Sequence, residues 1–269
     1  MLINERSPTI VGCTRVPVLM YHRVDPLEPG DDPRLCVTPQ LFESHLDWLA
    51  GNDYRPCTIG DFANWFAGEG SLAPGSILIT FDDGYRNLHE HVLPRLAARG
   101  WPATVFLVSG LIGRRDDWLA GDAGSTRSRL LLDRGQIGEM ARHGIEFHSH
   151  SRTHADLTSI DNDALVEQVR GSLEDLQHLL GTRVDHFAYP FGRSDGRVRD
   201  AVGAAGYRLA FSVKSGFNRA GSDSLAIRRL DITGFDSPVR FGRKVSMGTN
   251  DGTFRNQIRY LGKQLMARL

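Results

Sequence analysis

The sequence has 269 residues, of which 41% are hydrophobic, enough for one large domain or two small ones. Its 32 basic and 32 acidic residues give a formal net charge of +0, which argues against binding nucleic acid through a basic surface. Cys13, Cys36 and Cys57 lie far apart and form neither a disulfide framework nor a CxxC zinc motif, which is typical of a reducing compartment.

Two kinds of targeting segment are not found. Residues 1–20 include the acidic Glu5 and lack the apolar block and small-residue cleavage pattern of a secretory signal. No run of about 18 apolar residues occurs, so we expect no transmembrane helix. The sequence therefore predicts a cytoplasmic protein.

Strand-like and helix-like segments alternate along the chain. The first strand is expected at 16–22, and the helix after it begins with Thr38 as N-cap and Pro39 in the first turn. Pro94 is expected to bend the second helix. Further strands are expected at 76–81, 103–110, 145–150, 186–192, 208–213 and 225–233, and further helices at 87–100, 135–144, 163–181 and 196–206.

This alternation predicts parallel strands joined by crossover helices. A barrel of about seven or eight strands is favoured over an open sheet, because no glycine-rich phosphate turn follows the first strand. Residues 111–133 have no clean period and are expected to be an inserted loop that shapes a site. We expect an N-terminal extension at 1–15, the barrel at 16–247 and a basic amphipathic tail at 248–269.

In such a barrel the chemistry gathers where the strands end. Asp82 and Asp83 follow the strand at 76–81, a pattern that alone also fits a turn with a helix cap. His150 and His154 are spaced to lie on one face of a helical turn, as two imidazoles must to bind one ion.

A divalent metal ion would explain the adjacent carboxylates. Two imidazoles and one carboxylate form a common three-ligand site, and the neighbouring carboxylate can stay ionised beside the cation and accept a proton from water. His148 points to the same strand face as His150 and is an alternative ligand to His154.

Three motifs occur in order along the chain: "TFDDGYRN", "HSRTH" and "FAYPFG". Together they resemble the polysaccharide deacetylases of the NodB-homology type, carbohydrate esterase family 4. The segments "VPVLMYHRV" and "TPQLFESHLDWLAGNDYRPCTIGDF" resemble the branch that acts on poly-N-acetylglucosamine-like exopolysaccharides. The resemblance covers residues 16 to 232 and implies a distorted (β/α) barrel of about seven strands.

The resemblance also implies site residues. Asp82 would be the general base, and Asp83, His150 and His154 would bind the ion, zinc first, with cobalt or nickel as alternatives. His148 falls where relatives often carry glycine, so we interpret it as a neighbour of the site. The turn that contains Tyr189 and Phe191 would hold the oxyanion and the substrate.

The reaction implied is hydrolysis of an N-acyl group, usually acetyl, from an amino sugar of a glycan or its lipid-linked precursor. Two alternatives remain open. The chain is a deformylase or imide hydrolase on a non-polymeric substrate, or it is a catalytically silent carbohydrate-binding relative. A complete ligand set together with Asp82 favours an enzyme.

Two departures from the family pattern affect the catalytic groups. Ala188 stands where many relatives have an arginine that steadies the base, and Arg193 is a nearby arginine. The late leucine-x-histidine motif that supplies the acid is missing. We expect His22 to replace it, because in a closed barrel the first strand can take the place of the last. The alternative is that His22 caps a core strand beside Tyr21.

The tail has an apolar face and a basic face. One interpretation is a helix packed on the barrel with its basic side in solvent. The other is peripheral contact with the inner membrane surface, near lipid-linked glycans. The apolar residues are Phe254, Ile258, Leu261, Leu265 and Leu269, and the basic residues are Arg255, Arg259, Lys263 and Arg268.

Overall fold

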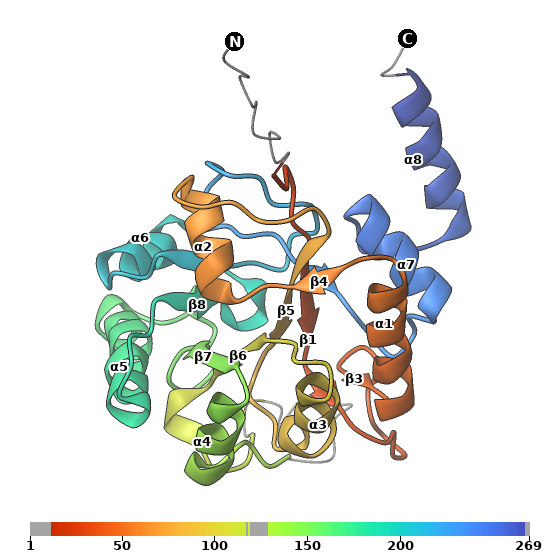
Figure 1. Cartoon of the computed structure of the whole chain (residues 1–269). Helices are drawn as coiled ribbons and strands as arrows, with labels where there is room; N and C mark the ends of the chain where they lie inside the picture. Colours follow the sequence, from red (N-terminus) through yellow and green to blue (C-terminus); the bar gives the residue numbers. More distant parts are fainter. Residues whose placement is uncertain (1–11, 117, 119–128, 267–269) are drawn as a thin grey trace, which may run out of the picture.

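The computed structural model describes residues 12–116, 118 and 129–266. Seven parallel strands form one curved sheet in the order β10-β1-β5-β6-β7-β8-β9, with helices packed around it (Figure 1). The strands are β1 (Val18–Tyr21), β5 (Ser76–Phe81), β6 (Ala103–Leu107), β7 (Ile145–Ser149), β8 (His186–Ala188), β9 (Leu209–Phe211) and β10 (Leu230–Asp231). β4 (Arg55–Pro56) pairs with the start of β5, while β2 (Arg23–Val24) and β3 (Cys36–Val37) pair with each other.

Strands β9 and β10 do not pair with each other, and the barrel is joined there by a parallel bridge between Phe211 and Ile227. β9 and β10 stand at opposite ends of the strand order, and the segment at 212–229 runs between them. Within this segment the Ser212 N–H donates to the Ile227 carbonyl at 2.8 Å and the Arg229 N–H donates to the Lys214 carbonyl at 3.0 Å. The predicted distorted (β/α) barrel of about seven strands is confirmed.

The helices largely follow the expected pattern. Thr38 caps the first helix by accepting a hydrogen bond from the Leu41 N–H, as predicted. The region around Pro94 is not one helix, because a π-helical turn at Leu88–Val92 precedes the short helix that contains the proline. The helices are α1 (Pro39–Gly51), α2 (Ile59–Ala67), α3 (Leu93–Ala97), α4 (Arg134–Arg142), α5 (Asn162–Leu180), α6 (Gly196–Ala204), α7 (Pro238–Met247) and α8 (Phe254–Met266).

The barrel interior is a packed core and not a channel. Alternate residues of each strand point inward, because successive side chains of a strand face opposite sides. Helix α2, which the sequence pattern did not reveal, closes the end where the strands begin (Figure 1). The interior cluster includes Val18, Leu78, Phe106, Ala188 and Phe211 of the strands, together with Ile59 and Phe62 of α2. Among the described residues, the opposite end, where the strands finish, is the one that α2 does not cover.

Helix α8 extends away from the barrel (Figure 1). Its apolar residues Phe254, Ile258 and Leu261 are 62%, 56% and 52% exposed, whereas Asn256 and Tyr260 are half-buried. The interpretation that the tail packs its apolar face on the barrel is therefore wrong. Among the described residues, no helix is both long enough and apolar enough to cross a membrane.

Candidate active site

The two aspartates and two of the histidines meet where β5 and β7 end. Asp83 lies just beyond β5, and the His150 imidazole just beyond β7. One carboxylate oxygen, Asp83 Oδ1, lies 3.4 Å from His150 Nε2 and 3.3 Å from His154 Nε2. All three side chains are buried, and their facing atoms lie within 4.8 Å of one another. The structure thus brings together the three predicted ligands.

The backbone at this cluster is strained. Asp83, Ser151, His154 and Phe191 have φ angles of 72°, 65°, 60° and 56°, in the left-handed region that favours glycine. Each such residue costs on the order of 1–3 kcal/mol, and strain of this kind concentrates at functional sites. The folded chain therefore holds two of the three predicted ligands, Asp83 and His154, and the Phe191 turn in conformations that local sequence disfavours.

The donor atoms fit a divalent ion. His150 Nδ1 lies 2.8 Å from the Ala188 carbonyl oxygen, so a neutral ring that donates this hydrogen bond turns an unprotonated Nε2 toward Asp83. Asp83 Oδ1 is buried and has no hydrogen-bond partner, because the two imidazoles face it without bonding geometry. Burial favours a raised pKa for Asp83, but His150 and His154 outweigh it and hold that pKa well below its usual value. A carboxylate and two imidazoles around one point suit zinc or a similar cation.

Asp82 has a different environment, since both of its oxygens are paired. Arg229 Nη1 and Nη2 donate to Asp82 Oδ1 and Oδ2 at 2.6 and 2.8 Å. Arg229 is fully buried and also donates from Nε to the Ser212 carbonyl at 3.0 Å. Burial favours a raised pKa for Asp82, but the Arg229 guanidinium and then His150 outweigh it, so the pKa is lowered. Arg229 lies outside the three motifs and was not among the predicted site residues.

Arg229 supplies the cation beside Asp82 that Ala188 cannot supply. The side chain comes from the end of the segment between β9 and β10, two strands that do not pair with each other, and it enters the barrel interior there. Arg193, the arginine near Ala188 in sequence, instead pairs with Asp156 at the surface and lies 62% exposed. The alternation of side chains along the extended segment "AIRRLD" could have indicated Arg229 as a site residue, because Arg229 shares a strand face with Ile227 and Asp231.

His22 lies at the same end of the barrel. It directly follows β1, and β1 pairs with β10 on one side and β5 on the other. A charge on His22 would lower the pKa values of Asp82, Asp83 and Asp231, so all three carboxylates are within its electrostatic reach. Burial raises the pKa of Asp231, and His22 opposes this shift. Strand β1 lies between β10 and β5, and the role of His22 in place of the late motif stays a prediction.

The aromatic residues of the third motif have separate environments. The Tyr189 hydroxyl donates to the Leu225 carbonyl at 3.0 Å, and its backbone N–H donates to the Phe211 carbonyl at 3.2 Å. Tyr189 is buried and has neither of these hydrogens free for a substrate. Phe191 is 46% exposed, with its ring edge-on to His154 at 4.5 Å between centroids.

The inserted loop reaches the site where it is described. The Trp118 ring stacks on His154 at 4.4 Å between centroids, and the Leu132 N–H donates to the Gly84 carbonyl at 2.8 Å. Residues 117 and 119–128 of the predicted loop lie outside the described residues. His154 thus contacts two aromatic rings, Trp118 and Phe191, which form an apolar wall beside the ligands.

His148 is not among the ligands that the structure brings together. It lies deeper in the barrel, 4.6 Å from His186 between ring centroids and in contact with Phe106. Its Nδ1 accepts a hydrogen bond from the Asp185 N–H at 3.3 Å, and burial lowers its pKa to about 3. The side chain is a satisfied interior histidine.

A family comparison agrees with this geometry. The family model described as polysaccharide deacetylase matches residues 69–210, more than half of the chain. The chain belongs to the polysaccharide deacetylase family. The family predicted from the three motifs is thereby confirmed, and this polysaccharide deacetylase is a hydrolase of carbon–nitrogen bonds other than peptide bonds. The matched region contains the two aspartates and the two histidines of the site, but neither His22 nor Arg229.

Individual relatives extend over most of the deacetylase. The poly-beta-1,6-N-acetyl-D-glucosamine N-deacetylase of Escherichia coli K12 is 24% identical over 84% of this chain, which spans only 38% of that relative. The structure of BC0361, a polysaccharide deacetylase from Bacillus cereus, matches with a TM-score of 0.70 at 27% identity, over 86% of this chain and 69% of that one. The Streptococcus pyogenes deacetylase PplD has the same fold, with a TM-score of 0.73 at 23% identity over 83% of this chain and 95% of its own.

Proposed function

We propose that the protein removes N-acetyl groups from amino-sugar-containing glycans of the poly-N-acetylglucosamine type, or from their lipid-linked precursors. The observation that carries this proposal is the pair of neighbouring carboxylates with opposite environments. Asp82 is ionised and held by Arg229, while Asp83 faces two imidazoles with an unpartnered oxygen. The Escherichia coli relative, named for this activity, supports the choice of substrate.

Asp83, His150 and His154 would hold one divalent ion, zinc being the ion that this donor set favours, with cobalt and nickel as alternatives. When bound, such an ion supplies Lewis acidity, which polarises an acyl carbonyl and lowers the pKa of a water molecule. The Ala188 carbonyl fixes the orientation of the His150 ring, and the two aromatic rings limit the water around His154.

We assign the two proton transfers to Asp82 and His22. Asp82 accepts the proton of the attacking water, whose oxygen bonds to the acyl carbon. His22 donates a proton to the amine nitrogen as the carbon–nitrogen bond breaks, because an unprotonated amide anion is a very poor leaving group. The products are acetate and a free amine, and the protein returns to its starting protonation state by exchange with solvent.

The oxyanion contact is assigned to the backbone of Phe191. Tyr189 has both its hydroxyl and its N–H committed to carbonyls of the protein, so it fixes the turn and does not meet the substrate. The left-handed conformation of Phe191 turns the backbone at the mouth beside His154, where a developing negative charge would need a donor.

The test combines metal analysis with a substrate screen. We expect about one divalent ion per chain and release of acetate from β-1,6-linked N-acetylglucosamine oligomers. His150→Ala and His154→Ala should each lose the ion, while His178→Ala, at an exposed histidine of α5, should keep it. Full occupancy in both ligand variants at limiting zinc would show that the site is wrong.

The same screen separates the alternatives. Metal binding with hydrolysis of formylated amino sugars or cyclic imides, but no acetate release from any glycan, would favour the deformylase or imide hydrolase. Glycan binding without hydrolysis of any substrate would favour a catalytically silent relative.

For the tail, we propose peripheral contact with an anionic membrane. Helix α8 turns its apolar stripe to solvent, and residues 252–266 contain Arg255, Arg259 and Lys263 but no acid. Co-sedimentation with phosphatidylglycerol vesicles tests this proposal, with phosphatidylcholine vesicles as the neutral control. The double variant Ile258→Gln/Leu261→Gln should bind the anionic vesicles more weakly, and equal binding by the variant and the natural chain would contradict the proposal.

A further inference from the structure

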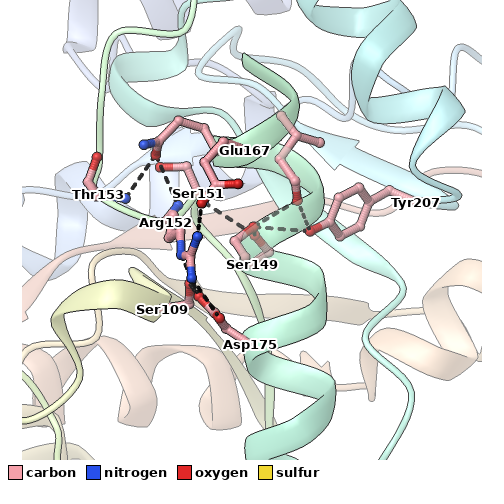
Figure 2. Close-up of polar contacts among 11 residues, drawn as sticks. Ser109, Ser149, Ser151, Arg152, Thr153, Glu167, Asp175 and Tyr207 are labelled. Carbon is pink, nitrogen blue, oxygen red and sulfur yellow. Dashed lines mark hydrogen bonds and ion pairs between the residues drawn. The ribbon is translucent and has the colours of Figure 1, made fainter. Parts of the chain in front are cut away.

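The loop at 150–154 carries both imidazoles of the proposed metal site and cannot keep its shape without outside support. It passes through the left-handed residues Ser151 and His154, each of which costs on the order of 1–3 kcal/mol. Figure 2 shows that side chains of α5 reach this loop from one side. The contacts form two groups, one buried and one nearer the surface.

The buried group is a chain of hydroxyls. The Ser149 and Ser172 Oγ atoms lie 2.6 Å apart, and the Tyr207 hydroxyl lies 3.3 Å from Ser172 Oγ (Figure 2). Ser149 Oγ accepts the Ser151 N–H at 3.3 Å, and Ser151 Oγ accepts the His154 N–H at 3.0 Å. An unbroken series of contacts thus joins Ser172 on α5 to the backbone of His154.

The second group holds the middle of the loop. Gln168 Oε1 accepts two backbone hydrogen bonds, from the Arg152 N–H at 3.2 Å and the Thr153 N–H at 2.9 Å. Asp175 Oδ2 accepts from Arg152 Nε and from Ser109 Oγ, each at 2.9 Å (Figure 2). Gly171 lies between these residues on α5, and a Cβ there would come within 3.2 Å of Arg152 Nη1.

We propose that helix α5 positions His154 for metal binding, with Gln168 as its main contact to the loop. A metal ligand is held in place by the hydrogen bonds around it, and loss of such a partner typically lowers metal affinity about 10–100-fold. Gln168 is suited to this role because one oxygen fixes two consecutive N–H groups directly before His154. This inference rests on the proposed function, since the site itself is part of that proposal.

The experiment compares zinc affinity with stability in three variants of the full chain. Gln168→Met keeps the length of the side chain and removes the acceptor, whereas Gln168→Glu keeps an acceptor oxygen. Glu174→Gln is the control, because Glu174 pairs with Arg170 on the exposed side of the same helix. Zinc dissociation constants come from competition with a chromophoric chelator, and melting temperatures from the zinc-free proteins.

We expect Gln168→Met to weaken zinc binding about 10-fold or more and Gln168→Met/Asp175→Asn up to about 100-fold. Gln168→Glu and Glu174→Gln should stay within about twofold of the natural chain. Equal zinc affinity in the natural chain, Gln168→Met and the double variant would overturn the inference while leaving the proposed function intact. Equal losses in Gln168→Met and Gln168→Glu would also overturn it. A natural chain that binds no zinc would instead refute the proposed metal site.

Discussion

Two pairs of buried imidazoles lie in the same barrel, and they differ in what surrounds them. The rings of His150 and His154 at the mouth are 4.9 Å apart at an interplanar angle of 65°, and those of His148 and His186 in the interior are 4.6 Å apart at 71°. The mouth pair faces Asp83, whereas the interior pair packs beside Phe106. Close, buried histidines are therefore not enough to make a metal site.

The difference appears in the ionisation of one ring, that of His150. Burial lowers the pKa of His148 to about 3 and that of His186 well below its usual value. Burial acts on His150 in the same direction, but Asp82 and Asp83 outweigh it and raise its pKa. For His154 burial outweighs Asp83, and its pKa is lowered. His148 and His150 are two residues apart on one strand face, so a single layer of the barrel separates a neutral interior from a charged mouth.

Removing the proposed base should have the largest effect on the mouth. Asp82→Asn is expected to lower kcat by about 10²–10⁴-fold, the usual contribution of a positioned base. Zinc content should stay at that of the natural chain, because Asp83 and the two imidazoles are unchanged. Kinetics with metal analysis of the same samples checks this. Loss of the ion together with activity would make Asp82 a ligand.

Removing the cation that pairs with Asp82 should be nearly as damaging. Arg229→Met leaves a buried carboxylate without its partner, which typically destabilises a protein by about 3–5 kcal/mol. Without Arg229, burial dominates and the pKa of Asp82 rises, so the acid limb of the pH–rate profile should move to higher pH.

Urea unfolding and a pH–rate series measure the two effects of Arg229. Arg228→Met is the matched control, because Arg228 is exposed and bonds to the Ser215 carbonyl. An unmoved acid limb in Arg229→Met would mean that Arg229 is structural and does not set the ionisation of Asp82.

Removing the proposed acid should have a smaller effect than removing the base. His22→Ala is expected to slow turnover about 10²-fold, the lower part of the range for general acids, because His22 is half-buried and water can partly replace it. The zinc content should not change, while the alkaline limb of the pH–rate profile should shift. An unchanged rate and profile would leave His22 as a strand cap.

A substitution in the interior pair should have the smallest effect, and this effect should be on stability alone. A histidine that is buried and neutral in the folded chain stabilises the fold at pH values above its usual pKa of about 6.5. This stabilisation is lost as the pH falls from there toward the lowered pKa that His186 has in the folded chain. His186→Phe removes one such group. Between pH 7 and pH 5 the natural chain should therefore lose about 2 kcal/mol more unfolding free energy than the variant. Parallel urea titrations at the two pH values check this, and equal losses would contradict it.

Much of the mouth could be predicted from the sequence because its signals are local. Asp82 and Asp83 are adjacent, His150 and His154 are four residues apart, and each pair directly follows a strand with a clear pattern. The barrel followed from the same alternation. Helix α2 follows the two-residue strand β4 and was missed, although α4 and α6, which are also nine residues long, were predicted.

The partners of these local motifs could not be predicted in the same way. Arg228 and Arg229 are adjacent and chemically identical, and only the direction of an extended segment sends one to solvent and the other to Asp82. The outward apolar face of α8 also depends on tertiary packing, because an amphipathic pattern does not say which side the rest of the chain will cover.

The Asp82–Arg229 pair joins residues 147 positions apart, and this separation has a consequence for synthesis on the ribosome. A nascent chain that has emerged only as far as β9 already contains the strands beside Asp82 but not its cation. Until residue 229 emerges, burying that aspartate is unfavourable, so the mouth is expected to stay open until the last strand docks beside β1. A fragment cut to the matched region, 69–210, would lack not only Arg229 but also strand β1, which pairs with β5 beside Asp82.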